Sequence, residues 1–163
     1  MRIVSNTSPL VFLAKLGKLE FLDKHELLVP SQVVDELRIW EKSGKDAYVL
    51  LMKWLAKANV TVKKAYILPE LPKSLHEGEK ATISLAISEK VKTVLIDERR
   101  ARIAAKMQGL NAVGTMALVK QQLNKNKITE KECRQIVLEL IKKGYRIKEE
   151  LLAEFLQNLE SKK

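Results

Sequence analysis

The run Thr93-Val94-Leu95-Ile96 constrains the fold more than any other part of this sequence. It is almost entirely apolar, ends at Asp97, and offers no polar face that could lie against solvent. Strands of this kind occur in parallel sheets whose two faces are both covered by helices. The run therefore predicts a buried strand of an α/β protein.

Strand-like and helix-like segments alternate along the rest of the chain. Parallel strands need crossover connections, which helices supply, so this alternation favours an α/β/α arrangement around a parallel sheet. Two prolines between residues 67 and 75 predict a loop there. The expected strands are residues 2–5, 27–30, 60–62, 93–96 and 112–113. The expected helices are one that runs from Leu10 through Leu16 and stops near Gly17, a short one that carries residues 19–22, and residues 31–44 (with Trp40 on its apolar face and Gly44 closing it), 47–58, 79–89 and 99–107.

The last forty residues show only helical periodicity and no Pro/Gly-rich linker precedes them. We therefore expect one domain over residues 1–163, in which residues 128–160 form a helical C-terminal extension packed on the same core. A length of 163 residues suits one such domain.

Cysteine usage and hydropathy predict a cytoplasmic protein with no membrane partner. Cys133 is the single cysteine, so no internal disulfide can form, and the longest apolar stretches are far shorter than the roughly 18 residues that cross a bilayer. The net charge of +10 is spread evenly along the chain. Nucleic-acid binding and a Lys/Glu-rich solvated surface both explain that charge.

Polar and acidic side chains occur where an α/β protein binds ligands. Such folds bind ligands at the carboxyl ends of their strands, and Asn6 and Asp97 follow two predicted strands directly. Glu36 and Glu79 lie in predicted helices next to other strands. A solvated acidic face would also explain Glu36, and stabilisation of a helix N-terminus would also explain Glu79. Asp97 needs a partner because an unpaired charge beside the core is costly.

The segment Arg99-Arg100-Ala101-Arg102 has three interpretations that the sequence leaves open. Its arginines could pair with Asp97, form a solvated helix face or hold phosphate groups. The two histidines, His25 and His76, have no ligand at zinc-site spacing, and no nucleophile-elbow, dinucleotide or P-loop motif occurs.

Five short motifs together resemble one known family. They occur in the order seen in PIN-domain proteins, and the first and third are similar to a prokaryotic, largely archaeal PIN-like subgroup related to the toxin ribonucleases of toxin–antitoxin pairs. The resemblance covers nearly the whole chain. The motifs are Val4-Ser5-Asn6-Thr7-Ser8-Pro9-Leu10, Pro30-x-x-Val33-x-x-Glu36-Leu37, Gly78-Glu79-x-Ala81, Leu95-Ile96-Asp97-Glu98 with Ala101-Arg102, and Gly114-Thr115.

The resemblance implies a three-layer α/β/α fold and a metal-dependent endoribonuclease site. Matched position by position, the catalytic and metal-binding residues would be Asn6, Glu36, Glu79 and Asp97, whose hard oxygens suit Mg²⁺ or Mn²⁺. It also implies single-stranded RNA as substrate, an antitoxin protein as a partner and a homodimer. The residues implied to contact RNA are Thr7, Ser8, Arg99, Arg100 and Arg102.

The first acidic position departs from the family pattern, because Asn6 stands where most active members carry Asp. Asn keeps one carbonyl oxygen but removes a negative charge. Three hypotheses follow: an active ribonuclease with Asn6 as a neutral ligand, an RNA-binding protein that does not cleave, or a protein-interaction module. A phosphoacceptor role for Asp97 would need an acidic pair after the first strand, and Ser5-Asn6 does not supply one.

Overall fold

The computed structural model describes residues 1–39 and 45–160. Contacts divide the chain into two compact units, Met1–Thr115 and Met116–Lys163. The sequence-based expectation that residues 128–160 pack on the same core as the sheet stays a prediction. Trp40 and Gly44, expected to end the helix that starts at Ser31, lie outside the described residues.

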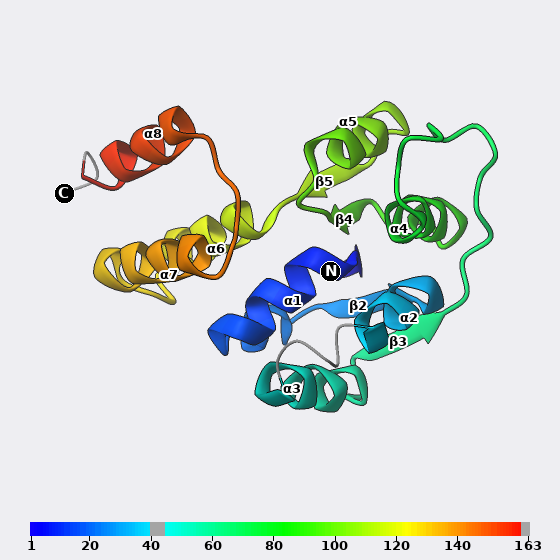
Figure 1. Cartoon of the computed structure of the whole chain (residues 1–163), viewed down its shortest axis with the longest axis horizontal. Coiled ribbons are helices and arrows are strands. Elements are labelled where there is room, and N and C mark those ends of the chain that lie inside the picture. Colours follow the sequence, from blue (N-terminus) through cyan, green and yellow to red (C-terminus); the bar gives the residue numbers. More distant parts are fainter. Residues whose placement is uncertain (40–44, 161–163) are drawn as a thin grey trace. The chain divides into compact units, whose positions relative to one another are not determined.

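The first unit is built on a five-stranded sheet in which all neighbouring strands are parallel (Figure 1). The strand order is β3-β2-β1-β4-β5, so β1 is central, with Val4 beside Leu28 of β2 and Val94 of β4. The parallel sheet expected from the sequence is therefore confirmed. The strands are β1 (Arg2–Ser5), β2 (Glu26–Pro30), β3 (Val60–Lys63), β4 (Thr93–Leu95) and β5 (Asn111–Val113).

Helices cover both faces of this sheet, which gives the three-layer α/β/α fold. The chain moves outward in one direction from β1 to β3 and in the opposite direction from β4 to β5. Right-handed crossovers then place the connecting helices of the two halves on opposite faces. In agreement, α1 packs against α3, and α4 packs against α5. The helices of this unit are α1 (Thr7–Leu16), the 3₁₀ helix η1 (Leu19–Leu22), α2 (Ser31–Ile39), α3 (Lys45–Leu55), α4 (Glu77–Ser88) and α5 (Arg99–Met107).

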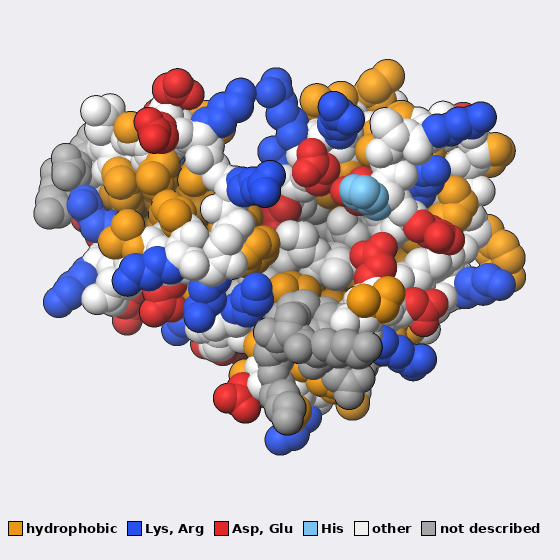
Figure 2. Space-filling model, in the orientation of Figure 1, with side chains coloured by type: hydrophobic (Ala, Val, Ile, Leu, Met, Phe, Trp, Pro, Cys, Tyr) orange, Lys and Arg blue, Asp and Glu red, His pale blue; other side chains and the backbone are white. Residues whose placement is uncertain are grey.

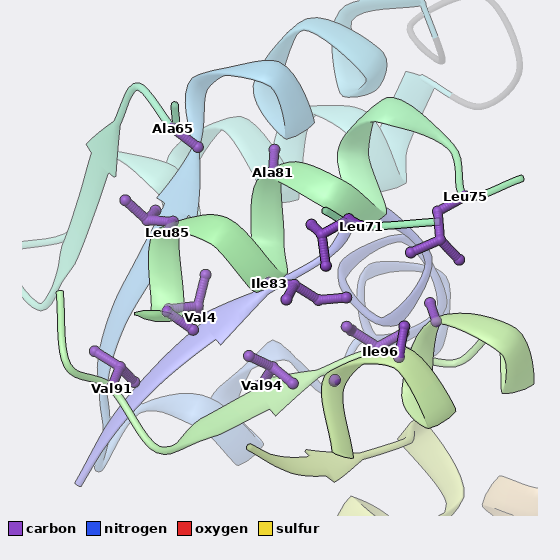
Figure 3. Close-up of a cluster of buried hydrophobic side chains, with 14 of the residues drawn as sticks. Val4, Ala65, Leu71, Leu75, Ala81, Ile83, Leu85, Val91, Val94 and Ile96 are labelled. Atoms are coloured by element: carbon purple, nitrogen blue, oxygen red, sulfur yellow. The ribbon is translucent and has the colours of Figure 1, made fainter. Parts of the chain in front are cut away.

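Helix α4 forms the centre of one hydrophobic core (Figure 3). Its residues Ile83 and Leu85 are at most 1% exposed and lie over Val4 of β1 and Val94 of β4. α4 begins two residues earlier than the periodicity predicts because polar groups, rather than apolar spacing, determine its first turn. This core holds the ends of β1 and β4 in register.

The second unit begins at Met116, directly after the first residue of helix α6 (Thr115–Asn124), and contains the rest of α6, α7 (Glu130–Lys142) and α8 (Glu149–Glu160). α7 begins with a capping box, because the Thr129 hydroxyl accepts the Glu132 N–H while Glu132 accepts the Thr129 N–H. α7 ends before Gly144, whose φ of 98° favours glycine. The helical prediction for this region is therefore right, but a break over residues 143–148 separates α7 from α8.

No helix within the described parts of the chain is both long and apolar enough to cross a membrane.

Candidate functional site

The strand order changes direction between β1 and β4, and Asn6 and Asp97 follow these two strands. The Asn6 N–H donates to the Leu95 carbonyl at 2.9 Å, which extends the pairing of the two strands to this edge. In open α/β sheets, ligands bind in the crevice at such a switch point. The structure therefore brings two of the predicted site residues to the expected ligand-binding edge.

Asn6 is buried, with 6% of its surface exposed, and occupies the N-cap position of α1. Asn is among the best N-cap residues, yet this side chain makes no capping hydrogen bond. Its Oδ1 atom is buried and has no hydrogen-bond partner among the residues that the structure describes. Buried acceptors are nearly always paired, so this oxygen is suited to a cation or a donor from outside the chain.

Glu36 projects from α2 and is held by two neighbouring segments. Its Oε2 atom accepts a hydrogen bond from the Thr7 hydroxyl, and its Oε1 atom accepts the Gly78 N–H at 3.0 Å. A Cβ atom on residue 78 would lie 2.8 Å from Glu36 Cδ, which is too close. Glycine at position 78 thus allows the carboxylate to reach the first turn of α4.

Glu79 is the next residue in that turn and is 6% exposed. Its Oε2 atom accepts the His76 N–H at 2.9 Å, which stabilises the start of α4. Burial raises the pKa of Glu79, and the negative charges of Glu98 and Glu36 raise it further, against the lowering effects of the His76 N–H and charge. The ionised form is therefore disfavoured unless positive charge is supplied nearby.

Asp97 is held by the residues that follow β5. Its Oδ1 atom accepts the Thr115 N–H at 2.7 Å, and its Oδ2 atom accepts the Thr115 hydroxyl at 2.7 Å. The Arg102 guanidinium donates to the Asp97 main-chain carbonyl. Arg102 thus contacts the main chain of Asp97, and its pairing with the Asp97 carboxylate stays a prediction.

The four residues predicted as metal ligands come from different elements of the fold. In residues 1–39 and 46–159, no three or more His, Cys, Asp or Glu side chains are grouped so that they could hold a metal ion. Glu36 and Glu79 meet at the start of α4, whereas Asp97 is tied to the start of α6. The ligand set taken from the family resemblance therefore stays a prediction.

The residues predicted to contact RNA differ in their surroundings. Thr7 is engaged with Glu36, Ser8 is half-buried, and Arg99 and Arg100 are exposed in the first turn of α5. Figure 2 shows acidic side chains gathered around a histidine over the part of the face where α4 and α5 lie in Figure 1, with Lys and Arg side chains farther out. Basic side chains next to an acidic area suit a phosphate backbone bridged by cations.

Two residues with direct roles at this edge, Gly78 and Thr115, were recognised in the sequence only as parts of motifs. Gly78 gives Glu36 room, and Thr115 binds Asp97. No spacing in the sequence indicates Thr115, because its contact with Asp97 depends on the register of β4 and β5: Leu95 pairs with Val113, so the residues two positions further on face each other.

Comparison with known proteins is consistent with this geometry. A family model described as a PIN domain matches residues 2–161, which is nearly the whole chain. A search of the curated proteins found no match.

Proposed function

Because this chain belongs to the PIN-domain family, we propose that it is a metal-dependent endoribonuclease that cleaves single-stranded RNA. The observation that carries the proposal is the buried, unpartnered Oδ1 atom of Asn6, at the switch point where β1 lies beside β4, the strand that Asp97 follows. That oxygen has the chemistry of a ligand for a hard cation.

The donor set suits Mg²⁺ or Mn²⁺. Asn6, Glu36, Glu79 and Asp97 would hold the ion, since all four offer hard oxygen atoms. Each carboxylate of Glu36 and Asp97 already accepts two hydrogen bonds, but a carboxylate has about four acceptor positions. Mg²⁺ commonly uses one or two carboxylates together with water and substrate phosphates, so a closed cage of protein ligands is not required.

A bound divalent ion would supply positive charge to the phosphodiester oxygens and make water a stronger nucleophile. The residues of the chain itself would orient the reacting groups. Asp97, fixed by Thr115, and the buried Glu79 would face the scissile phosphate from neighbouring elements. Arg99 and Arg100, both exposed at the start of α5, would hold flanking phosphates.

One observation favours a second candidate function, an RNA-binding protein that does not cleave. Asn6 is neutral, and it stands where most active members of the family carry an acidic residue. One fewer negative charge among the ligands weakens the attraction for a divalent ion. In that case RNA affinity would fall steeply with salt, because phosphate contacts release counterions, and no metal-dependent product would form.

The test is cleavage of a fluorescent single-stranded RNA by the purified chain, with and without Mn²⁺. We expect Mn²⁺-dependent cleavage that falls at least 100-fold in Asp97→Asn. Asp35→Asn is the matched control, because Asp35 is exposed on α2 and should leave the rate unchanged. Equal cleavage by wild type and Asp97→Asn would contradict the proposal. RNA binding without any product would favour the second candidate.

We also propose an antitoxin protein and a second copy of this chain as partners, as in related toxin ribonucleases. Apolar side chains of α8 support this, because Leu151 is 54% exposed and Leu152, Phe155 and Leu156 are only partly buried. Sedimentation equilibrium at micromolar concentration tests the dimer: a monomer would contradict it. Co-purification with the product of a neighbouring gene tests the antitoxin.

A further inference from the structure

We propose that Thr115 is a positioning residue that fixes the orientation of the Asp97 carboxylate for metal binding. This inference rests on the proposed function, because it assumes that Asp97 contacts a divalent ion. It adds a residue that was not among the predicted site residues.

The contact between these two residues is bidentate. The Thr115 N–H and hydroxyl donate to the two carboxylate oxygens of Asp97, each at 2.7 Å. Thr115 is fully buried, so water does not compete for these bonds. Two bonds to two oxygens fix both the position and the rotation of the carboxylate plane, which one bond cannot do.

The strand register explains why these residues meet. Leu95 of β4 lies beside Val113 of β5, and the Ile96 N–H donates to the Val113 carbonyl at 2.9 Å. Asp97 and Thr115 are each two residues beyond that pair, and so they face each other at the carboxyl edge. The position of Thr115 therefore follows from the sheet itself.

Gly114 and Arg102 complete the support of Asp97. A Cβ atom on residue 114 would lie 3.2 Å from Asp97 Oδ1, so glycine leaves the carboxylate room at this point. The Arg102 guanidinium donates to the main-chain carbonyl of Asp97. Backbone and side chain of Asp97 are thus held by separate groups, which is typical of a ligand that must keep one orientation.

Substitutions at Thr115 distinguish the contribution of its hydroxyl from that of its N–H. Thr115→Val keeps the shape and the N–H but removes the hydroxyl, so the carboxylate loses one of the two Thr115 bonds that orient it. Thr115→Ser keeps both donors. Loss of a group that orients a metal ligand typically weakens metal affinity 10- to 100-fold. We expect this loss in Thr115→Val, and near wild-type affinity in Thr115→Ser.

The experiment measures Mn²⁺ binding to the metal-free, full-length chain by electron paramagnetic resonance, alongside kcat and KM for RNA cleavage. We expect Thr115→Val to raise the Kd for Mn²⁺ 10- to 100-fold and to lower kcat at sub-saturating Mn²⁺, with little change in KM. Thr61→Val on β3 is the control, because Thr61 is exposed and should bind Mn²⁺ as wild type does.

Gly114→Ala provides a second, independent variant in case Thr115→Val folds poorly. Its methyl group would lie 3.2 Å from Asp97 Oδ1 and shift the carboxylate slightly while leaving the Thr115 hydroxyl in place, so it should weaken Mn²⁺ binding in the same direction but less than Thr115→Val does. A folded Thr115→Val that binds Mn²⁺ as tightly as wild type would overturn the proposal, as would unchanged binding in both variants or a wild-type chain that binds no Mn²⁺.

The two proposals fail in different ways. Cleavage by wild type together with unchanged Mn²⁺ binding in Thr115→Val would remove the role of Thr115 and leave the nuclease function intact. Mn²⁺ binding that depends on Thr115, in a chain that cleaves no RNA, would support the positioning role and contradict the nuclease function.

Discussion

The Gly78 N–H donates to Glu36 Oε1 at 3.0 Å, and this bond joins the first turn of α4 to α2. The first N–H groups of a helix have no partner within the helix. A carboxylate from another element is a favourable acceptor there, because the N-terminus of a helix carries partial positive charge. Glu36 therefore stabilises α4 as well as the candidate site.

Gly78→Ala should destabilise the protein by about 1–3 kcal/mol, the usual range for overpacking a filled space. The added methyl group would lie 2.8 Å from Glu36 Cδ and displace the carboxylate from the α4 N-terminus. Urea unfolding followed by circular dichroism measures the effect. The control is Gly78→Ala in a Glu36→Ala background, where the methyl group has space and the loss should largely disappear. Equal losses in both backgrounds would show that Glu36 is not the cause.

Glu79→Gln should flatten the dependence of stability on pH. The pKa of Glu79 is raised in the folded chain above its ordinary value of 4.5, chiefly by burial. The folded state therefore binds this proton more tightly than the unfolded state does. The stability that this provides is fully present below pH 4.5 and is lost as pH rises through the raised pKa.

The measurement is the free energy of unfolding between pH 4 and 8 for wild type and Glu79→Gln. The difference, wild type minus variant, should fall as pH rises. Glu77→Gln, an exposed neighbour in the same turn, serves as the control and should keep the wild-type slope. A difference that stays constant across this range would show that Glu79 does not titrate abnormally.

Asn6→Asp should strengthen metal binding and weaken the metal-free fold. The new carboxylate would be buried at an edge that already holds Asp97, so without metal we expect a loss of roughly 1–3 kcal/mol. Mn²⁺ should reverse this loss, because binding to the folded state alone stabilises it. Melting temperatures with EDTA and with Mn²⁺ test both parts, and Asn111→Asp, at an exposed position on β5, is the control. Identical responses of the two variants to Mn²⁺ would argue against a cation beside Asn6.

Thr129→Ala should destabilise the second unit by about 1 kcal/mol, because it removes the hydroxyl that accepts the Glu132 N–H at the start of α7. Thr129→Ser keeps this acceptor and should stay within a few tenths of a kcal/mol of wild type. Hydrogen exchange of the amides in the first turn of α7 locates the effect. Protection that is unchanged in Thr129→Ala would mean that the cap contributes nothing there.

Much of the fold could be predicted because its strands and helices each produce a periodic pattern of apolar residues in the sequence. The apolar run before Asp97 is a buried strand, and the alternation of strands and helices does form a parallel sheet. The predicted ends of helices were less accurate, because capping hydrogen bonds determine where a helix begins. The hydrogen bond from the His76 N–H to Glu79 places the start of α4 earlier than its apolar spacing indicates. The break around Gly144 was missed because apolar residues continue at helical spacing on both sides of it.

The candidate site was predictable only in part. Asn6 and Asp97 could be placed at one edge because both directly follow strands, and the strand order does make β1 and β4 neighbours. The Thr115–Asp97 and Gly78–Glu36 contacts depend on strand register and on the close approach of a backbone N–H. Neither property appears in the spacing of residues along a single chain.

The central place of β1 has a consequence for biosynthesis. β1 leaves the ribosome long before β4, so Val4 can pair with Leu28 early but must wait for Val94. At about 5–20 residues per second, the other edge of β1 stays open for roughly 5–20 s during translation. During that time the edge of β1 that later pairs with β4 has unpaired backbone groups, and such an edge is where a partly made chain is prone to aggregate.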